Sequence, residues 1–156
     1  MIPHRHPVRV YYDDTDAGGI VYHANYLRFA ERGRTEALRD MGAPHADMTA
    51  LHGLFFMVRR IKVDYLAPAR LDDLLVVETT TLAVGAASVE LRQDIVRDSV
   101  LLARIEVQLV CGRIADQRPA RIPPRWRETM RALAGCDAVA GTGIRLGGHG
   151  SAACRA

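Results

Sequence analysis

The chain has 156 residues, of which 49% are hydrophobic and 25% are charged, and its formal net charge is +3. This balance is typical of one soluble globular domain, and a chain of this length can bury a core without disulfides or metals. No apolar run approaches the roughly 20 residues that a membrane span requires, and the N-terminal residues lack the apolar segment of a secretory signal. Three Cys without a C-x-x-C pair predict neither a disulfide framework nor a zinc site. They favour a reducing cytoplasm.

The N-terminal part predicts a strand, a polar turn and a long helix. Residues 8–12 are β-branched or aromatic and predict the strand, whereas residues 13–19 hold three Asp and two Gly, as a turn does. Between His23 and Met41, small and apolar side chains recur at spacings of three and four, which predicts an amphipathic helix. Its expected buried face consists of Tyr26, Phe29, Ala30, Gly33, Ala37, Leu38 and Met41.

The rest of the chain predicts strands, because apolar and polar residues alternate in each segment. These strands are expected at 59–65, 74–82, 88–97 and 101–111, and a short helix that begins with Pro at 123–133. The Gly- and Ala-rich residues 135–156 are expected to form a flexible tail beyond a domain at 1–134.

This order of elements predicts an α+β fold in which one long helix covers a five-stranded antiparallel sheet. Such a sheet leaves a strand edge open, and proteins usually cover or pair a long edge. We therefore expect a homo-oligomer.

The turn before the helix carries the chemistry. The first N–H groups of a helix lack intrahelical partners and can polarise a carbonyl oxygen. A carboxylate held beside them, such as Asp16, could act as nucleophile or general base. Asp residues in such a turn are also common as turn or capping residues. Asp14 and Asp16 could bind a cation, but two carboxylates are a weak metal signal. No nucleophile elbow or phosphate-binding loop is present.

Four residues of this turn and helix match an Asp-x-x-Gly-x-Val-x-x-x-x-Tyr pattern, namely Asp16, Gly19, Val21 and Tyr26. The chain thereby resembles the 4-hydroxybenzoyl-CoA thioesterase family, which has the hotdog fold. Residues 10–26 and 63–73 are most similar to its Tol–Pal-associated acyl-CoA thioesterases, and the similarity extends from about residue 7 to residue 124.

The resemblance implies roles for individual residues. Asp16 falls on the catalytic carboxylate, as nucleophile or general base. His23 falls on the second catalytic position, where its backbone N–H polarises the thioester carbonyl and its imidazole is a further candidate contact. Gly19, Val21 and Tyr26 are expected to shape the substrate-binding surface, with Tyr26 packing under the site rather than reacting.

In the family, the site lies at a dimer interface and one wall comes from the partner's strand at residues 56–62. Arg59 and Lys62 are therefore candidate contacts with acyl or CoA groups, although a solvated strand face explains them equally well. A homodimer or homotetramer is expected, and no metal or organic cofactor. The Arg-rich run at 118–131 is a candidate contact with CoA phosphates or the inner membrane, but a solvated face is the simpler interpretation.

The expected function is hydrolysis of an acyl-CoA thioester, with acyl carrier protein as an alternative carrier. The acyl group itself is not specified. One alternative is a hotdog dehydratase, in which Glu31 or Glu36 would supply the acid. Another is a non-catalytic protein that binds acyl-CoA or acyl carrier protein, or acts as a scaffold of the cell-envelope machinery. A nucleic-acid partner is not expected, since only 6% of the residues are aromatic and no basic–aromatic interleaving occurs.

Overall fold

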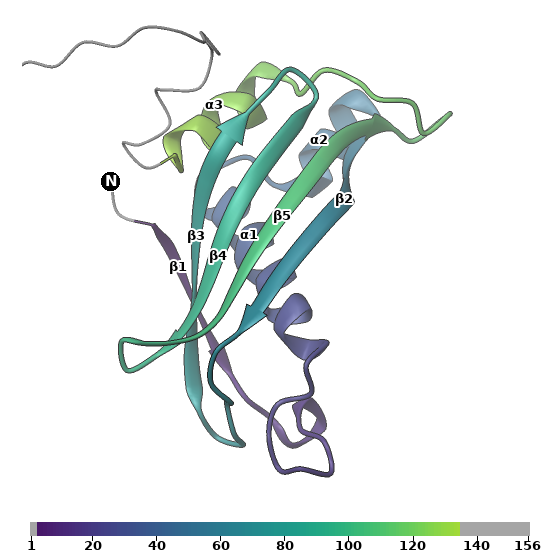
Figure 1. Cartoon of the computed structure of the whole chain (residues 1–156). Coiled ribbons are helices and arrows are strands. Elements are labelled where there is room, and N and C mark those ends of the chain that lie inside the picture. The colour runs from purple at the N-terminus through teal and green to yellow at the C-terminus, as the bar shows by residue number, and fades with distance from the viewer. Residues whose placement is uncertain (1–2, 135–156) are drawn as a thin grey trace, which may run out of the picture.

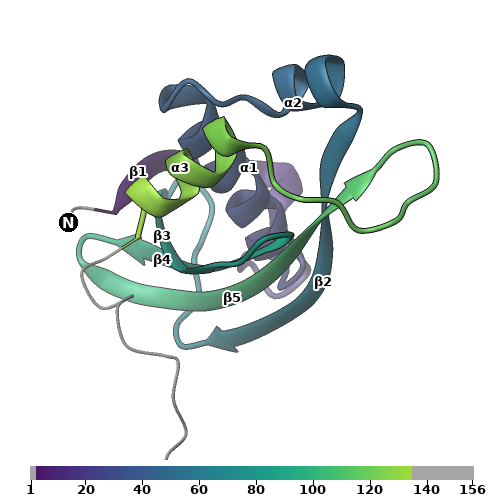
Figure 2. The same ribbon diagram turned by 90° about the horizontal axis from the view of Figure 1, so that it is seen from above.

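A computed structural model describes residues 3–134, so the predicted tail at 135–156 lies outside the described residues. Five antiparallel strands form one curved sheet in the order β1-β3-β4-β5-β2, and the long helix α1 lies across its concave face (Figures 1 and 2). The strands are β1 (His4–Arg9), β2 (Leu54–Tyr65), β3 (Leu74–Val84), β4 (Ser88–Arg97) and β5 (Val100–Arg113), and the helices are α1 (Asn25–Asp40), α2 (His45–His52) and α3 (Pro124–Ala132). The predicted α+β architecture is confirmed.

Helix α1 buries the face that the spacing predicts, with one exception. Phe29, Ala30 and Ala37 are almost completely buried against the sheet. Met41 was expected on the same face, but it follows the last helical residue and stays exposed. The chain turns away there because Gly42 adopts a left-handed conformation, with φ of 73°, that ends the helix.

Three of the predicted strands agree with the structure, and two need correction. Strand β4 has the predicted bounds, and the reversal after it is left-handed at Asp98 and Ser99. The first strand covers His4–Arg9 instead of residues 8–12, because its residues pair with β3 whereas Tyr12 begins a short 3-10 turn. Strand β2 begins at Leu54 instead of residue 59, and helix α2 before it was not predicted.

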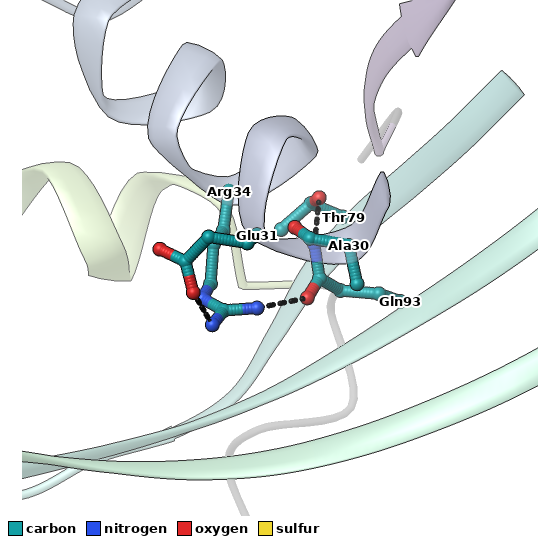
Figure 3. A network of polar contacts seen from close by, with 5 residues as sticks. All are labelled: Ala30, Glu31, Arg34, Thr79 and Gln93. Carbon is teal, nitrogen blue, oxygen red and sulfur yellow. Dashed lines mark hydrogen bonds and ion pairs between the residues drawn. The ribbon is translucent and has the colours of Figure 1, made fainter. Parts of the chain in front are cut away.

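A buried polar network joins α1 to the sheet (Figure 3). The side chain of Gln93 in β4 is fully buried, and its amide donates to the carbonyl oxygen of Ala30 at 2.8 Å and to the hydroxyl of Thr79 at 3.0 Å. Its own oxygen accepts a hydrogen bond from Arg34, which also pairs with Glu31. Burial lowers the pKa of the Arg34 guanidinium. The network satisfies groups that would be costly to bury without partners.

The backbone of α1 lies close to the sheet at Gly33. A Cβ atom at this position would lie 2.5 Å from Cγ1 of Val77, a buried and β-branched residue of β3. Glycine costs helix stability in an exposed position, but here it lets the backbone of α1 lie directly on the strands.

Replacing Gly33 with Ala should therefore destabilise the fold by about 1–3 kcal/mol, because the added methyl group overlaps Val77. Chemical denaturation monitored by circular dichroism measures the free energy of unfolding. Arg32→Ala, on the exposed face of the same helix, is the control and should change it by less than about 0.5 kcal/mol. A stabilised Gly33→Ala protein would contradict this description of the packing.

Candidate active site

The loop between β1 and α1 folds back on itself around Asp16. The Asp16 N–H donates to the carbonyl of Ile20 at 2.9 Å, and the Gly19 N–H donates to the carbonyl of Asp16 at 3.0 Å. Gly19 has a φ of 71°, which explains why a residue without a Cβ stands there. Oδ1 of Asp16 accepts the Gly18 N–H at 2.8 Å. Asp16 is exposed, and its Oδ2 has no hydrogen-bond partner within residues 3–134.

One carbonyl group holds this loop against the start of α1. The carbonyl oxygen of Asp14 accepts the backbone N–H of Tyr22 and the side-chain amide of Asn25, both at 2.9 Å. The Asp14 carboxylate instead accepts the Tyr11 N–H, so this buried Asp is a turn residue. Asn25 was not predicted from the sequence as a site residue. An Asn immediately before an apolar helical face indicates a capping position, but its partner is the loop rather than the helix.

His23 lies in the turn that leads into α1, next to Tyr65, the last residue of β2. Its backbone N–H has no hydrogen-bond partner within the described part of the chain. Its carbonyl oxygen accepts the hydroxyl of Tyr65 at 2.8 Å. Because α1 begins two residues later, at Asn25, the free N–H of His23 lies at the positive end of a 16-residue helix. There it can donate to an oxygen that gains negative charge.

A cavity of about 350 Å³ opens beside this turn. His23 and Tyr65 contribute to its wall together with residues of two neighbouring loops, and the complete lining is Ile20, Val21, His23, Tyr26, Tyr65, Leu66, Ala67 and Pro68. The wall is mostly apolar, as expected of a ligand pocket. Asp16 does not line this cavity, although it belongs to the same folded loop.

Val21 and Tyr26 form the base of the site. Both are buried, and both bind Ala69: the Val21 N–H donates to its carbonyl at 2.9 Å, while the Tyr26 hydroxyl accepts its N–H at 3.0 Å. Burial raises the pKa of Tyr26, so this phenol stays protonated at neutral pH. Tyr26 thus packs beneath the cavity and fixes the loop on its far side.

Arg59 and Lys62 are not brought to Asp16 within one chain. Arg59 is exposed at an irregularity in the pairing of β2 with β5. Lys62 lies opposite Glu106, faces away from α1, and forms an ion pair with Asp64 at 3.4 Å. A role for either residue would therefore depend on a partner subunit.

The dehydratase alternative finds no support around α1. Glu31 pairs with Arg34 and Glu36 with Arg39, so neither is a free acid directed at His23. Within residues 3–134, no group of three or more His, Cys, Asp or Glu side chains is arranged to hold a metal ion. No helix in that range is both long and apolar enough to cross a membrane.

Comparisons with known proteins identify the family. A family model described as "Thioesterase superfamily" matches residues 18–103, and that range begins just after Asp16. The chain is 42% identical over 127 residues to the acyl-CoA thioesterase YbgC of Haemophilus influenzae, which covers 81% of this chain and 93% of that protein. The chain belongs to the thioesterase superfamily.

Other members of the thioesterase superfamily support this assignment. The acyl-CoA thioester hydrolase YbgC of Escherichia coli is 45% identical over 122 residues, or 76% of this chain and 89% of that protein. The crystal structure of a probable thioesterase from Bartonella henselae is 35% identical and has a TM-score of 0.73, with 78% of this chain and 99% of that chain covered. The predicted family and hotdog fold are confirmed.

Replacing Tyr26 with Phe should lower the free energy of unfolding by about 1–3 kcal/mol, because the buried Ala69 N–H loses its acceptor. Chemical denaturation measures this change. A Tyr11→Phe protein, which loses a hydroxyl from an exposed ring, is the matched control and should change little. Equal stabilities of the two variants would show that Tyr26 does not hold the loop.

Proposed function

We propose that this protein hydrolyses acyl-CoA thioesters to a free acid and CoA, using Asp16 as the carboxylate and the His23 N–H as the donor to the thioester oxygen. The main observation is the backbone N–H of His23, which has no partner within residues 3–134 and lies beside an apolar cavity at a helix N-terminus. Relatives that carry the name acyl-CoA thioesterase support the substrate class.

The chemistry follows from where charge develops. Attack on the thioester carbonyl places negative charge on its oxygen, and a preorganised backbone donor stabilises that charge by about 3–4 kcal/mol. Because the Gly18 N–H binds Oδ1 of Asp16, the carboxylate is held in one orientation and Oδ2 remains free to act. In one route Asp16 attacks the carbonyl and expels the CoA thiolate, and water then hydrolyses the resulting mixed anhydride. In the other Asp16 takes a proton from water, whose oxygen adds to the carbonyl, and the C–S bond breaks to release the thiolate.

We also propose that two chains pair through β2 to complete the site. This 12-residue strand lies at an edge of the sheet, and Val58, Ile61 and Tyr65 on its helix-facing side are 47%, 38% and 48% exposed. A long edge strand with exposed apolar side chains is usually covered. Pairing of two β2 edges would bring the partner's strand, with its Arg59 and Lys62, towards the cavity.

Location, carrier and membrane contact belong to the same proposal. The only free Cys among the described residues, Cys111, is buried, and burial raises the pKa of its thiol to about 11, consistent with an unreactive residue in a reducing cytoplasm. Acyl carrier protein stays an alternative carrier. In the Arg-rich run, Arg125 already pairs with Asp47 at 3.1 Å, which leaves less free charge for an anionic surface.

The second candidate function is binding without hydrolysis, as an acyl-CoA or acyl-carrier-protein scaffold of the cell envelope. One observation favours it: Asp16 does not line the cavity beside His23 in a single chain. In that case the protein would retain acyl-CoA without releasing thiol.

Replacement of Asp16 by Asn should reduce thiol release from acyl-CoA at least about 100-fold, because the amide can neither attack nor accept the proton of water. The assay uses short aliphatic, long aliphatic and aromatic acyl-CoAs with a thiol reagent. Asp13→Asn removes an exposed carboxylate from the same loop and should retain activity. Full turnover by Asp16→Asn would refute the mechanism, and binding without turnover by the unmodified protein would favour the scaffold.

Sedimentation equilibrium should give a mass of at least two chains for the unmodified protein. The double variant Val58→Glu, Ile61→Glu places charge along the β2 edge and should shift the mass towards one chain, with loss of thiol release. Arg92→Ala, on the outer face of β4, should leave the mass unchanged. A fully active single chain would contradict pairing through β2.

A further inference from the structure

We propose that Tyr65 is a positioning residue for thioester hydrolysis, since its hydroxyl group holds the backbone on one side of the His23 N–H. The inference rests on the proposed function and adds to it a residue that does not touch the reacting atoms. The Asp-x-x-Gly-x-Val-x-x-x-x-Tyr pattern does not include Tyr65, which belongs to the second segment of resemblance at residues 63–73 and was given no role there.

Two peptide groups flank His23, and each is held by a different contact. The peptide group before it contains the His23 N–H and the Tyr22 carbonyl, which accepts the backbone N–H of Asn25 at 2.8 Å. The peptide group after it contains the His23 carbonyl, which accepts the Tyr65 hydroxyl at 2.8 Å. Because a peptide group is planar, the Tyr22 carbonyl and the His23 N–H share one plane, so the Asn25 contact orients this N–H directly. The Tyr65 contact holds the next peptide group, and it therefore limits rotation about φ and ψ of His23 and fixes the place of the turn, with its N–H, relative to the sheet.

The Tyr65 contact comes from a separate element. Within residues 3–134 it is the only hydrogen bond from a strand side chain to the backbone between Asp16 and Asn25. The Asn25 contact lies inside the same turn and moves with it. Tyr65 is therefore the strand side chain that ties the turn to the sheet, and without its hydroxyl the turn at His23 loses this connection.

Aromatic packing fixes the Tyr65 hydroxyl. Its ring makes an edge contact with the buried ring of Tyr26, with centroids 5.5 Å apart at 75°, and a second with the His23 imidazole, at 6.4 Å and 89°. Tyr26 is itself held by the Ala69 N–H. Burial raises the pKa of Tyr65, so the phenol stays protonated and remains a donor at neutral pH.

The side chain also lines the cavity next to His23, so the test must keep its ring. Tyr65→Phe removes only the oxygen atom and leaves the cavity wall in place. An oxyanion donor that is out of place stabilises the transition state less, while its effect on binding of the substrate is small. The loss should therefore lower kcat rather than raise KM.

Steady-state kinetics of Tyr65→Phe should show kcat lowered about tenfold and KM changed less than about twofold. Thermal unfolding should stay close to that of the unmodified protein. Tyr11→Phe, which removes the hydroxyl of an exposed ring before the same loop, is the matched control and should keep kcat.

The outcomes separate the inference from the function on which it rests. Thiol release that depends on Asp16 but keeps its full kcat in Tyr65→Phe would overturn the positioning role alone. A raised KM at unchanged kcat would assign Tyr65 to substrate binding, and a lower melting temperature with kcat unchanged below it would assign it to stability; either overturns the inference. Thiol release that does not depend on Asp16 would instead refute the proposed function, whatever Tyr65→Phe does.

Discussion

The close approach of α1 to the sheet determines where the helix and the loops at its N-terminal end lie. At Gly33 the helix backbone lies directly on Val77, and Gln93 reaches from β4 to the carbonyl of Ala30. A larger residue at position 33 would lift the helix away from the sheet. The buried side-chain amide of Gln93 has only one set of partners, so it limits how far α1 can slide or rotate. The position of the whole helix, including its N-terminal end, follows from these contacts.

The candidate site is built at that end from groups that are themselves held in place. The Asp14 carbonyl folds the loop onto α1, Gly18 orients the carboxylate of Asp16, and Tyr65 ties the turn at His23 to the sheet. Such an arrangement matches what acyl transfer requires, which is a donor that is already oriented before charge appears on the carbonyl oxygen. Tyr65 is the last residue of the edge strand β2. Pairing of two chains through β2 would therefore place the partner close to the turn at His23.

Regular patterns predicted the fold well, and contacts distant in sequence explain the failures. The apolar spacing from Tyr26 to Leu38 and the alternation in β4 each specify a buried face directly. The strand expected at residues 8–12 was misplaced because β-propensity favours Tyr11 and Tyr12, whereas pairing with β3 selects His4–Arg9. The alternation in β4 places position 93 on the buried face, but it cannot reveal that Gln93 binds Arg34, that Arg34 is buried, or that Tyr65 binds His23, since these contacts join residues more than 40 positions apart.

Whether the helix N-terminus polarises the substrate can be measured from the infrared stretching frequency of a ¹³C-labelled thioester carbonyl bound to the inactive Asp16→Asn protein. Hydrogen bonding from the His23 N–H at the helix N-terminus should polarise the carbonyl and lower this frequency below its value in water. A frequency equal to or above the value in water would contradict the account, because the carbonyl would then not lie at the helix end.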